Sequence, residues 1–134
     1  MEPQHAIEEL KIISDFMRTY LILRLYRLTL LFGTCGAIIT AIASDSVRNR
    51  GFAVILMLKI AAVVISAAFT VMDFTAAGHW IRLRKRANEL APVIGYHQFP
   101  TPSRWSPFTA SGASNYLHVA ILVLWVASLF LTPQ

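Results

Sequence analysis

Four polar residues within an apolar stretch have the greatest potential for chemistry in this sequence. Lys59, Ser66, Thr70 and Asp73 follow one another at steps of seven, four and three residues. A helix turns by 100° per residue, so it would place all four within about 60° of one another. A charged side chain at the centre of a membrane costs about 2.5–3.5 kcal/mol and often marks a functional contact. The stripe therefore predicts either a water-filled lumen or a contact between subunits.

A simpler interpretation of this stripe stays open. Lys59 can extend its ammonium group to the outer membrane interface, since long side chains reach water while their stems stay in apolar surroundings. The hydroxyl groups of the stripe can bond to carbonyl groups of their own helix. In that case the stripe has no lumen or partner to face.

Small residues form a second pattern, about twenty residues before the polar stripe. Residues 33, 37 and 41 lie four apart, and so do residues 36 and 40. Small side chains at this spacing let the backbones of two membrane helices approach closely. The contact is either with another subunit or between spans of the same chain. The helix-packing residues predicted in this way are Gly33, Gly36, Ala37, Thr40 and Ala41.

Basic residues gather at two places that flank apolar stretches. Arg24 and Arg27 lie near one end of the first stretch, and Arg82, Arg84, Lys85 and Arg86 follow the second. Each basic side chain near an anionic membrane surface contributes about 1 kcal/mol. We therefore expect these six residues to bind lipid headgroups and to fix the orientation of the chain. Specific binding of a partner is the alternative, whereas nucleic-acid binding is not expected without a recognised fold for it.

Motifs for catalysis or metal binding are not found in the sequence. The four histidines have no metal-ligand spacing, and Cys35 is the only cysteine. No glycine-rich phosphate loop, nucleophile elbow or HExxH motif occurs. The sequence therefore predicts no enzyme activity, no catalytic residue, no metal and no cofactor, and Cys35 is expected to be a buried, inert thiol.

The elements that must position these residues follow from composition and periodicity. The 134 residues are 56% apolar and 14% charged, whereas a soluble domain has roughly 25% charged residues. We expect a single all-α integral membrane domain with an amphipathic N-terminal helix and three transmembrane helices. The amphipathic helix is expected to lie on the membrane or against a neighbouring subunit, and to continue directly into the first span. The expected elements are the amphipathic helix 6–19, spans 20–44, 52–72 and 113–132, a helical extension 73–91 of the second span, and a loop 92–111 rich in proline and aromatic residues.

The distribution of basic residues predicts the orientation in the membrane. The N-terminal segment and the second connection carry nine Lys and Arg residues, and the first turn carries two. Cytoplasmic segments carry the excess of Lys and Arg. We therefore expect a bacterial inner-membrane protein with a cytoplasmic N-terminus, a cytoplasmic extension of the second span and a C-terminus outside.

The order of elements resembles that of a known family. The extension reads Arg86-Ala87-Asn88-Glu89-Leu90 and is followed by Gly95, Phe99 and Pro100. Over residues 20–100 the chain is similar to the RipA-like family of small bacterial inner-membrane proteins, and this resemblance implies an octamer. Over residues 20–90 it also resembles the SLATT-type effectors of bacterial defence systems, which have two spans rather than three. Neither resemblance implies catalytic residues.

Taken together, these patterns favour a homo-oligomeric inner-membrane protein that forms a ring or pore-like assembly. Lys59, Ser66, Thr70 and Asp73 would then line the lumen or a subunit contact. An accessory subunit that docks on a larger membrane complex through the loop 92–111 is the alternative. A small transporter ranks last, because Asp73 lies at the edge of its span rather than in the middle.

Overall fold

The computed structural model describes residues 3–95 and 110–131, and this part of the chain is almost entirely helical. The elements are α1 (Pro3–Ala43), α2 (Asp45–Arg48), α3 (Phe52–Leu90), the 3-10 helix η1 (Ala91–Ile94) and α4 (Ala110–Phe130). Three of them, α1, α3 and α4, are long and apolar enough to cross a membrane. This confirms the predicted all-helical class and the number of candidate spans.

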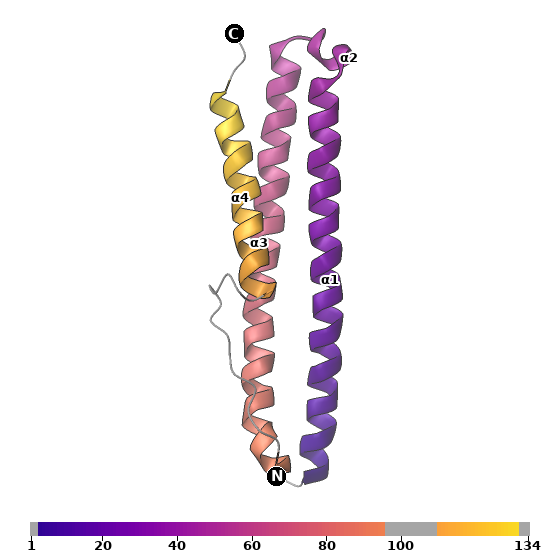
Figure 1. Cartoon of the computed structure of the whole chain (residues 1–134), viewed down its shortest axis with the longest axis vertical. Coiled ribbons are helices and arrows are strands. Elements are labelled where there is room, and N and C mark those ends of the chain that lie inside the picture. The colour runs from indigo at the N-terminus through magenta and orange to yellow at the C-terminus, as the bar shows by residue number, and fades with distance from the viewer. Residues whose placement is uncertain (1–2, 96–109, 132–134) are drawn as a thin grey trace.

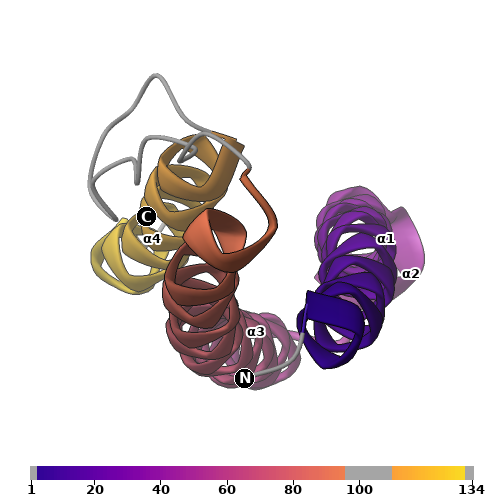
Figure 2. The same cartoon turned by 90° about the horizontal axis from the view of Figure 1, so that it is seen from below.

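Helices α1 and α3 form a long antiparallel hairpin. They run side by side over their whole lengths, with α2 at the closed end (Figure 1). The turn ends at Gly51, whose φ of +92° is disfavoured for residues with a side chain. Helix α4 packs against the half of α3 nearest the turn, so that α3 lies between α1 and α4 (Figures 1 and 2).

The hairpin is longer than a membrane is thick. At 1.5 Å per residue the 41 residues of α1 span roughly 60 Å, whereas a bilayer core is about 30 Å thick. The half of the hairpin that lies beside α4 has about the length of a bilayer core. The other half, residues 3–23 of α1 and 74–90 of α3, is called the hairpin extension below.

Two apolar clusters hold the helices together, one in each half of the hairpin. The first lies among the three helices and contains Leu31, Cys35, Ala62 and Trp125; the cysteine is buried, as predicted. The second, in the hairpin extension, contains Ala6, Ile13 and Leu90, with Leu10 and Met17 packed against it. The apolar face predicted for residues 6–19 therefore packs on α3 of the same chain. Within the single chain these apolar residues therefore already have a partner, which the continuous hairpin supplies.

The other boundaries differ little from the predicted ones. The second span and its extension form one continuous helix, and this helix ends at Leu90, before Pro92. The chain then continues as η1 to Ile94, and Gly95 follows with a φ of +73°. Helix α4 begins at Ala110, earlier than the predicted residue 113. Most of the predicted loop, residues 96–109, lies outside the described part of the chain.

Candidate functional site: a buried polar network among three helices

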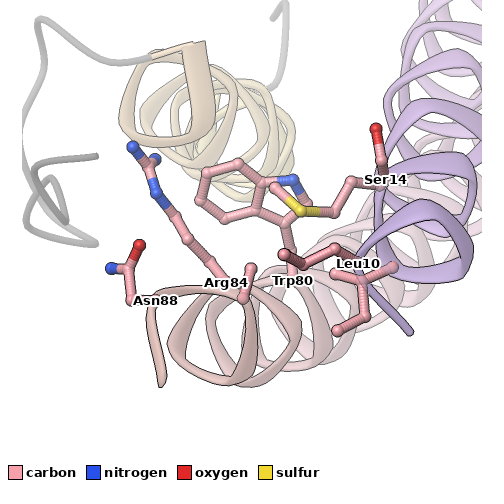
Figure 3. A pocket seen from close by; sticks show the side chains of 8 residues that line it. Leu10, Ser14, Trp80, Arg84 and Asn88 are labelled. Atoms are coloured by element: carbon pink, nitrogen blue, oxygen red, sulfur yellow. The ribbon is translucent and has the colours of Figure 1, made fainter. Parts of the chain in front are cut away.

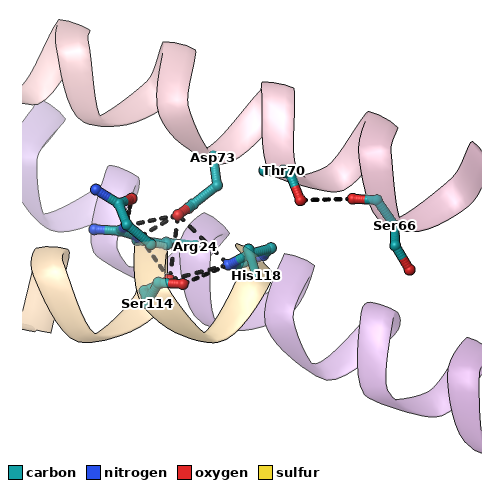
Figure 4. A network of polar contacts seen from close by, with 7 residues as sticks. Arg24, Ser66, Thr70, Asp73, Ser114 and His118 are labelled. Atoms are coloured by element: carbon teal, nitrogen blue, oxygen red, sulfur yellow. Dashed lines mark hydrogen bonds and ion pairs between the residues drawn. The ribbon is translucent and has the colours of Figure 1, made fainter. Parts of the chain in front are cut away.

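An ion pair between α1 and α3 is the centre of the polar network (Figure 4). Arg24 donates from Nε to Oδ1 of Asp73 at 2.8 Å and from Nη2 to Oδ2 at 2.6 Å. The Arg24 side chain is 10% exposed and that of Asp73 is fully buried. This two-point geometry is the strongest arrangement of guanidinium and carboxylate groups. Since a buried charge is costly without a partner, each residue requires the other.

Helix α4 joins this ion pair through three polar residues in its first turns. Arg24 also donates to Ser114 Oγ at 3.1 Å and to Asn115 Oδ1 at 2.9 Å, and Ser114 Oγ donates to Asp73 Oδ2 at 3.3 Å. His118 is buried beside them, with its Nδ1 2.8 Å from the Ser114 carbonyl oxygen and 3.6 Å from Asp73 Oδ2. One guanidinium group thus connects all three long helices.

The surroundings of His118 indicate which ring nitrogen carries a proton. Its Nδ1 faces a carbonyl oxygen and a carboxylate oxygen, and both are acceptors. We therefore assign a proton to Nδ1. His118 Nε2 and Asn115 Nδ2 are buried without a hydrogen-bond partner among the described residues. The network is thus incomplete at these two atoms.

The rest of the predicted polar stripe lies on α3 nearer the turn. The Thr70 hydroxyl donates to the Ser66 carbonyl oxygen at 2.7 Å (Figure 4). Ser66 Oγ is buried 4.0 Å from Cys35 Sγ, which accepts a hydrogen bond of 3.2 Å from Trp125 Nε1. Polar contacts therefore link α3 to α1 and α1 to α4 at this level as well.

Lys59 binds the end of α4. Its Nζ donates to the carbonyl oxygens of Ser128 at 2.6 Å and Leu131 at 3.1 Å. The last carbonyl groups of a helix have no partner within the helix, and a cation there also interacts favourably with the helix dipole. Lys59 therefore fixes α4 on α3 and satisfies carbonyl groups in an apolar region.

Replacing Lys59 with methionine is expected to loosen the end of α4. Loss of the cation should reduce the free energy of local opening there by up to ~2 kcal/mol. Faster hydrogen exchange of the backbone amides of residues 127–131 would show this effect. K59R, which keeps a cationic donor, should retain most of the protection. Equal exchange rates in K59M and the wild type would contradict the capping role.

These contacts correct the interpretation of the stripe for the single chain. Ser66, Thr70 and Asp73 are buried, and all four stripe residues have their contacts within the chain. The structure therefore brings them together as a packing surface of α3, with Thr70 bonded to its own helix. Sequence analysis missed Arg24, Ser114 and Asn115 as partners, although opposite charges equally far from a tight turn are a usable signal for Arg24 and Asp73.

The basic residues predicted to bind headgroups fall into four groups. The prediction for Arg24 must be corrected, since its side chain turns inward to the buried Asp73. Arg84 and Arg86 have partners within the hairpin extension. Arg82 and Lys85 are exposed, and Arg27 lines a cavity between α1 and α3.

Arg84 belongs to a groove in the hairpin extension. Its guanidinium carbon lies 4.9 Å from the centre of the Trp80 ring, within the range of a cation–π contact. Both residues line a cavity of about 350 Å³, with Leu10 and Ser14 on the α1 side and Asn88 on the α3 side (Figure 3). Arg84 therefore has an aromatic partner and does not simply extend into solvent.

Arg86 connects the two helices of the extension near its open end. It donates from Nε to Glu9 Oε1 at 2.7 Å and from Nη1 to Glu89 Oε2 at 3.4 Å. The hydrogen bond and the charge of Glu9, followed by the hydrogen bond of Glu89, raise the pKa of Arg86 above its usual value. All three side chains are exposed, so the contact orients the helices more than it stabilises them.

The predicted small-residue face remains uncovered in the single chain. Gly33, Gly36, Ala37 and Thr40 are exposed, and Ala41 is half-buried. A methyl group added at either glycine would meet nothing within 4 Å. The packing of α1 on α3 uses the opposite side of α1, which contains Arg24, Leu31 and Cys35.

The described residues thus define a class of protein rather than an active site: a helical protein with three potential membrane spans joined by a buried ion network. No group of three or more metal-ligating residues occurs in the described part of the chain. Comparisons with protein-family models, curated proteins and solved structures give no match. The resemblance to RipA-like proteins stays a prediction, and function is inferred from the geometry of this chain.

Proposed function

We propose that this protein is an integral protein of the bacterial inner membrane whose copies join side by side into a closed ring or pore-like assembly. The N-terminus and the hairpin extension lie in the cytoplasm, and the C-terminus lies outside. The observation that carries this proposal is the match between the outer faces of α1 and α3. Both faces are exposed in the single chain, and they complement each other in charge and in size.

The first part of the match is direction. Asp15 and Gly33 each lie nine residues from Arg24, which is two and a half helical turns. Because the Arg24 side chain points at α3, positions 15 and 33 lie on the opposite face of α1, which is directed away from α3. On α3, Arg82 and Val64 each lie nine residues from Asp73, so their side chains point away from the ion pair.

The second part of the match is height along the hairpin. The ion pair places Arg24 level with Asp73, and the two helices are antiparallel. Nine residues further from the turn, Asp15 on α1 is therefore level with Arg82 on α3. Nine residues closer to the turn, Gly33 is level with Val64. Two copies side by side at the same depth would place the outer face of α1 on the outer face of α3.

The residues that would meet in this contact are complementary. Asp15 and Arg82 have opposite charges, and both are exposed without an ion pair among the described residues. In the membrane part, Val64 is 61% exposed, and the open position of Gly33 leaves space for it. Close packing on small residues supplies the attraction between membrane helices, and exposed ion pairs set orientation more than affinity.

The hairpin extension strengthens the case for a second copy over lipid alone. Ile7, Ile12 and Phe16 are 54%, 56% and 60% exposed. By the length of α1 they lie beyond the bilayer core, where acyl chains cannot cover them. Ile12 is three residues from Asp15 and so shares the outer face of α1. A contact of different faces propagates from copy to copy and closes when the rotations complete a circle.

Native mass spectrometry of the protein released from nanodiscs tests the assembly. We expect one main particle whose mass is a multiple of the 15.0 kDa chain. A monomer would overturn the proposal. So would a single copy bound to a different protein, which would instead support the accessory subunit of a larger membrane complex.

Reversal of charges tests the orientation of the contact. D15R and R82D should each shift the particle towards monomer, because each places like charges opposite one another. The double variant D15R/R82D should restore the wild-type mass, since the pair is re-formed in the opposite sense. D45R, in the exposed turn, is the matched control and should leave the mass unchanged. Single reversals without effect, or a double variant that fails to recover, would exclude this contact.

A further inference from the structure

A cavity of about 340 Å³ lies between α1 and α3 at the level of the Arg24–Asp73 pair. Its lining residues come from α1 and α3 alone, so the cavity does not involve α4. Val71, Met72 and Ala76 form an apolar wall, and Tyr20, Arg27 and His79 contribute the larger polar groups. It contains no acidic lining residue, although the buried Asp73 lies next to Met72 in sequence.

Three polar side chains of this cavity, those of Tyr20, Arg27 and His79, can each donate a hydrogen bond, whereas the Thr75 hydroxyl already donates to the Val71 carbonyl oxygen of its own helix. The Tyr20 hydroxyl is buried without a hydrogen-bond partner among the described residues. Arg27 is half-buried and forms no ion pair in the described part of the chain. Helical side chains lean towards the N-terminus of their helix, and α1 and α3 are antiparallel. Arg27 and His79 therefore lean towards each other from the two ends of the cavity, which suits an anion with several acceptor oxygens.

The position of the cavity indicates the source of this anion. Arg27 immediately precedes the 17 residues from Leu28 to Ser44 that contain no charge. The cavity therefore lies where the charge-free part of α1 begins, which is the headgroup level of an inserted chain. Val71 and Met72 are 65% and 49% exposed and continue the wall towards the membrane part of α3. An acyl chain can lie along them, whereas a free phosphate ion would gain nothing from this wall.

We propose that this cavity binds the phosphate group of an anionic glycerophospholipid, with Arg27 as its main cationic ligand, the Tyr20 hydroxyl as a second donor and Val71 and Met72 against an acyl chain. The site rests on the membrane insertion proposed above and does not require the ring. It adds a ligand of defined chemistry to a chain in which the buried Arg24 is already paired with Asp73.

Native mass spectrometry of protein purified in detergent and titrated with phosphatidylglycerol tests this site. The wild type should retain bound phosphatidylglycerol, and R27Q should bind it about tenfold more weakly, which corresponds to ~1.4 kcal/mol. Y20F should show a smaller loss. R48Q, in the exposed turn, is the matched control and should bind like the wild type. Circular dichroism of each variant establishes that the helices remain folded.

Four results would overturn the proposal. R27Q could bind phosphatidylglycerol as well as the wild type does, or R48Q could lose as much binding as R27Q. Zwitterionic phosphatidylcholine could bind equally well, in which case the charge of the headgroup is not recognised. Inorganic phosphate could displace the lipid at equal concentration, in which case the apolar wall contributes nothing. The same spectra report the number of copies, so failure of the ring and failure of the lipid site are separate outcomes.

Discussion

Replacing Arg24 with leucine is expected to lower the free energy of unfolding by ~3–5 kcal/mol, which is the effect of breaking a buried ion pair from one side. Asp73 would keep its carboxylate in a fully buried position and lose both hydrogen bonds from the guanidinium group. Asn115 Oδ1 would lose its donor as well. Ser114 and His118, the remaining neighbours of the carboxylate, do not replace a cation that spans three helices.

The double variant R24L/D73L separates the charge from the packing. Apolar residues of similar volume can replace a buried ion pair at little cost, so the double variant should recover most of the lost stability. Equilibrium unfolding in mixed micelles, followed by far-ultraviolet circular dichroism, measures the three free energies. R50L removes an exposed arginine of the turn and is the matched control. If R24L and R50L unfold alike, the ion pair does not hold the helices together.

The number of long helices and their approximate ends could be predicted because apolar length and periodicity are local properties of the sequence. The uncharged run after Arg27 and the absence of proline between residues 6 and 43 are sufficient to predict a single long helix, and α1 is one. Pro92 likewise marks the end of α3, since the residue before a proline disfavours helical geometry. These features do not depend on which helices meet.

The partners in the site could not be predicted because they depend on how the helices are aligned. The stripe on α3 was visible as a pattern, but Asp73 faces Arg24 only after the turn at 44–51 fixes the antiparallel hairpin. Ser114 and Asn115 were still harder to predict as partners of the ion pair. A connection of about twenty residues precedes α4, and a connection of that length fixes neither the depth nor the rotation of α4 against α3.

Replacing Gly33 with leucine is expected to abolish the ring without unfolding the chain. A Cβ atom at Gly33 would meet nothing within 4 Å, so the single chain has room for the new side chain. Leucine also favours a helix by up to ~1 kcal/mol relative to glycine. In the proposed assembly the leucine would project into the position that Val64 of the next copy occupies. Overpacking of this kind typically costs about 1–3 kcal/mol, and the ring repeats this cost at every contact.

Native mass spectrometry should therefore find G33L mainly as a monomer with wild-type helical content. A127L adds the same side chain to an exposed position on α4 and should leave the assembly intact. The double variant G33L/V64A, which removes bulk from the opposing face, should recover part of the assembly. An unchanged particle mass for G33L would show that the outer face of α1 contacts lipid rather than protein. The contact between copies would then have to lie elsewhere, and α4, which packs on α3 but leaves Val123 and Leu124 exposed, offers the next face to test.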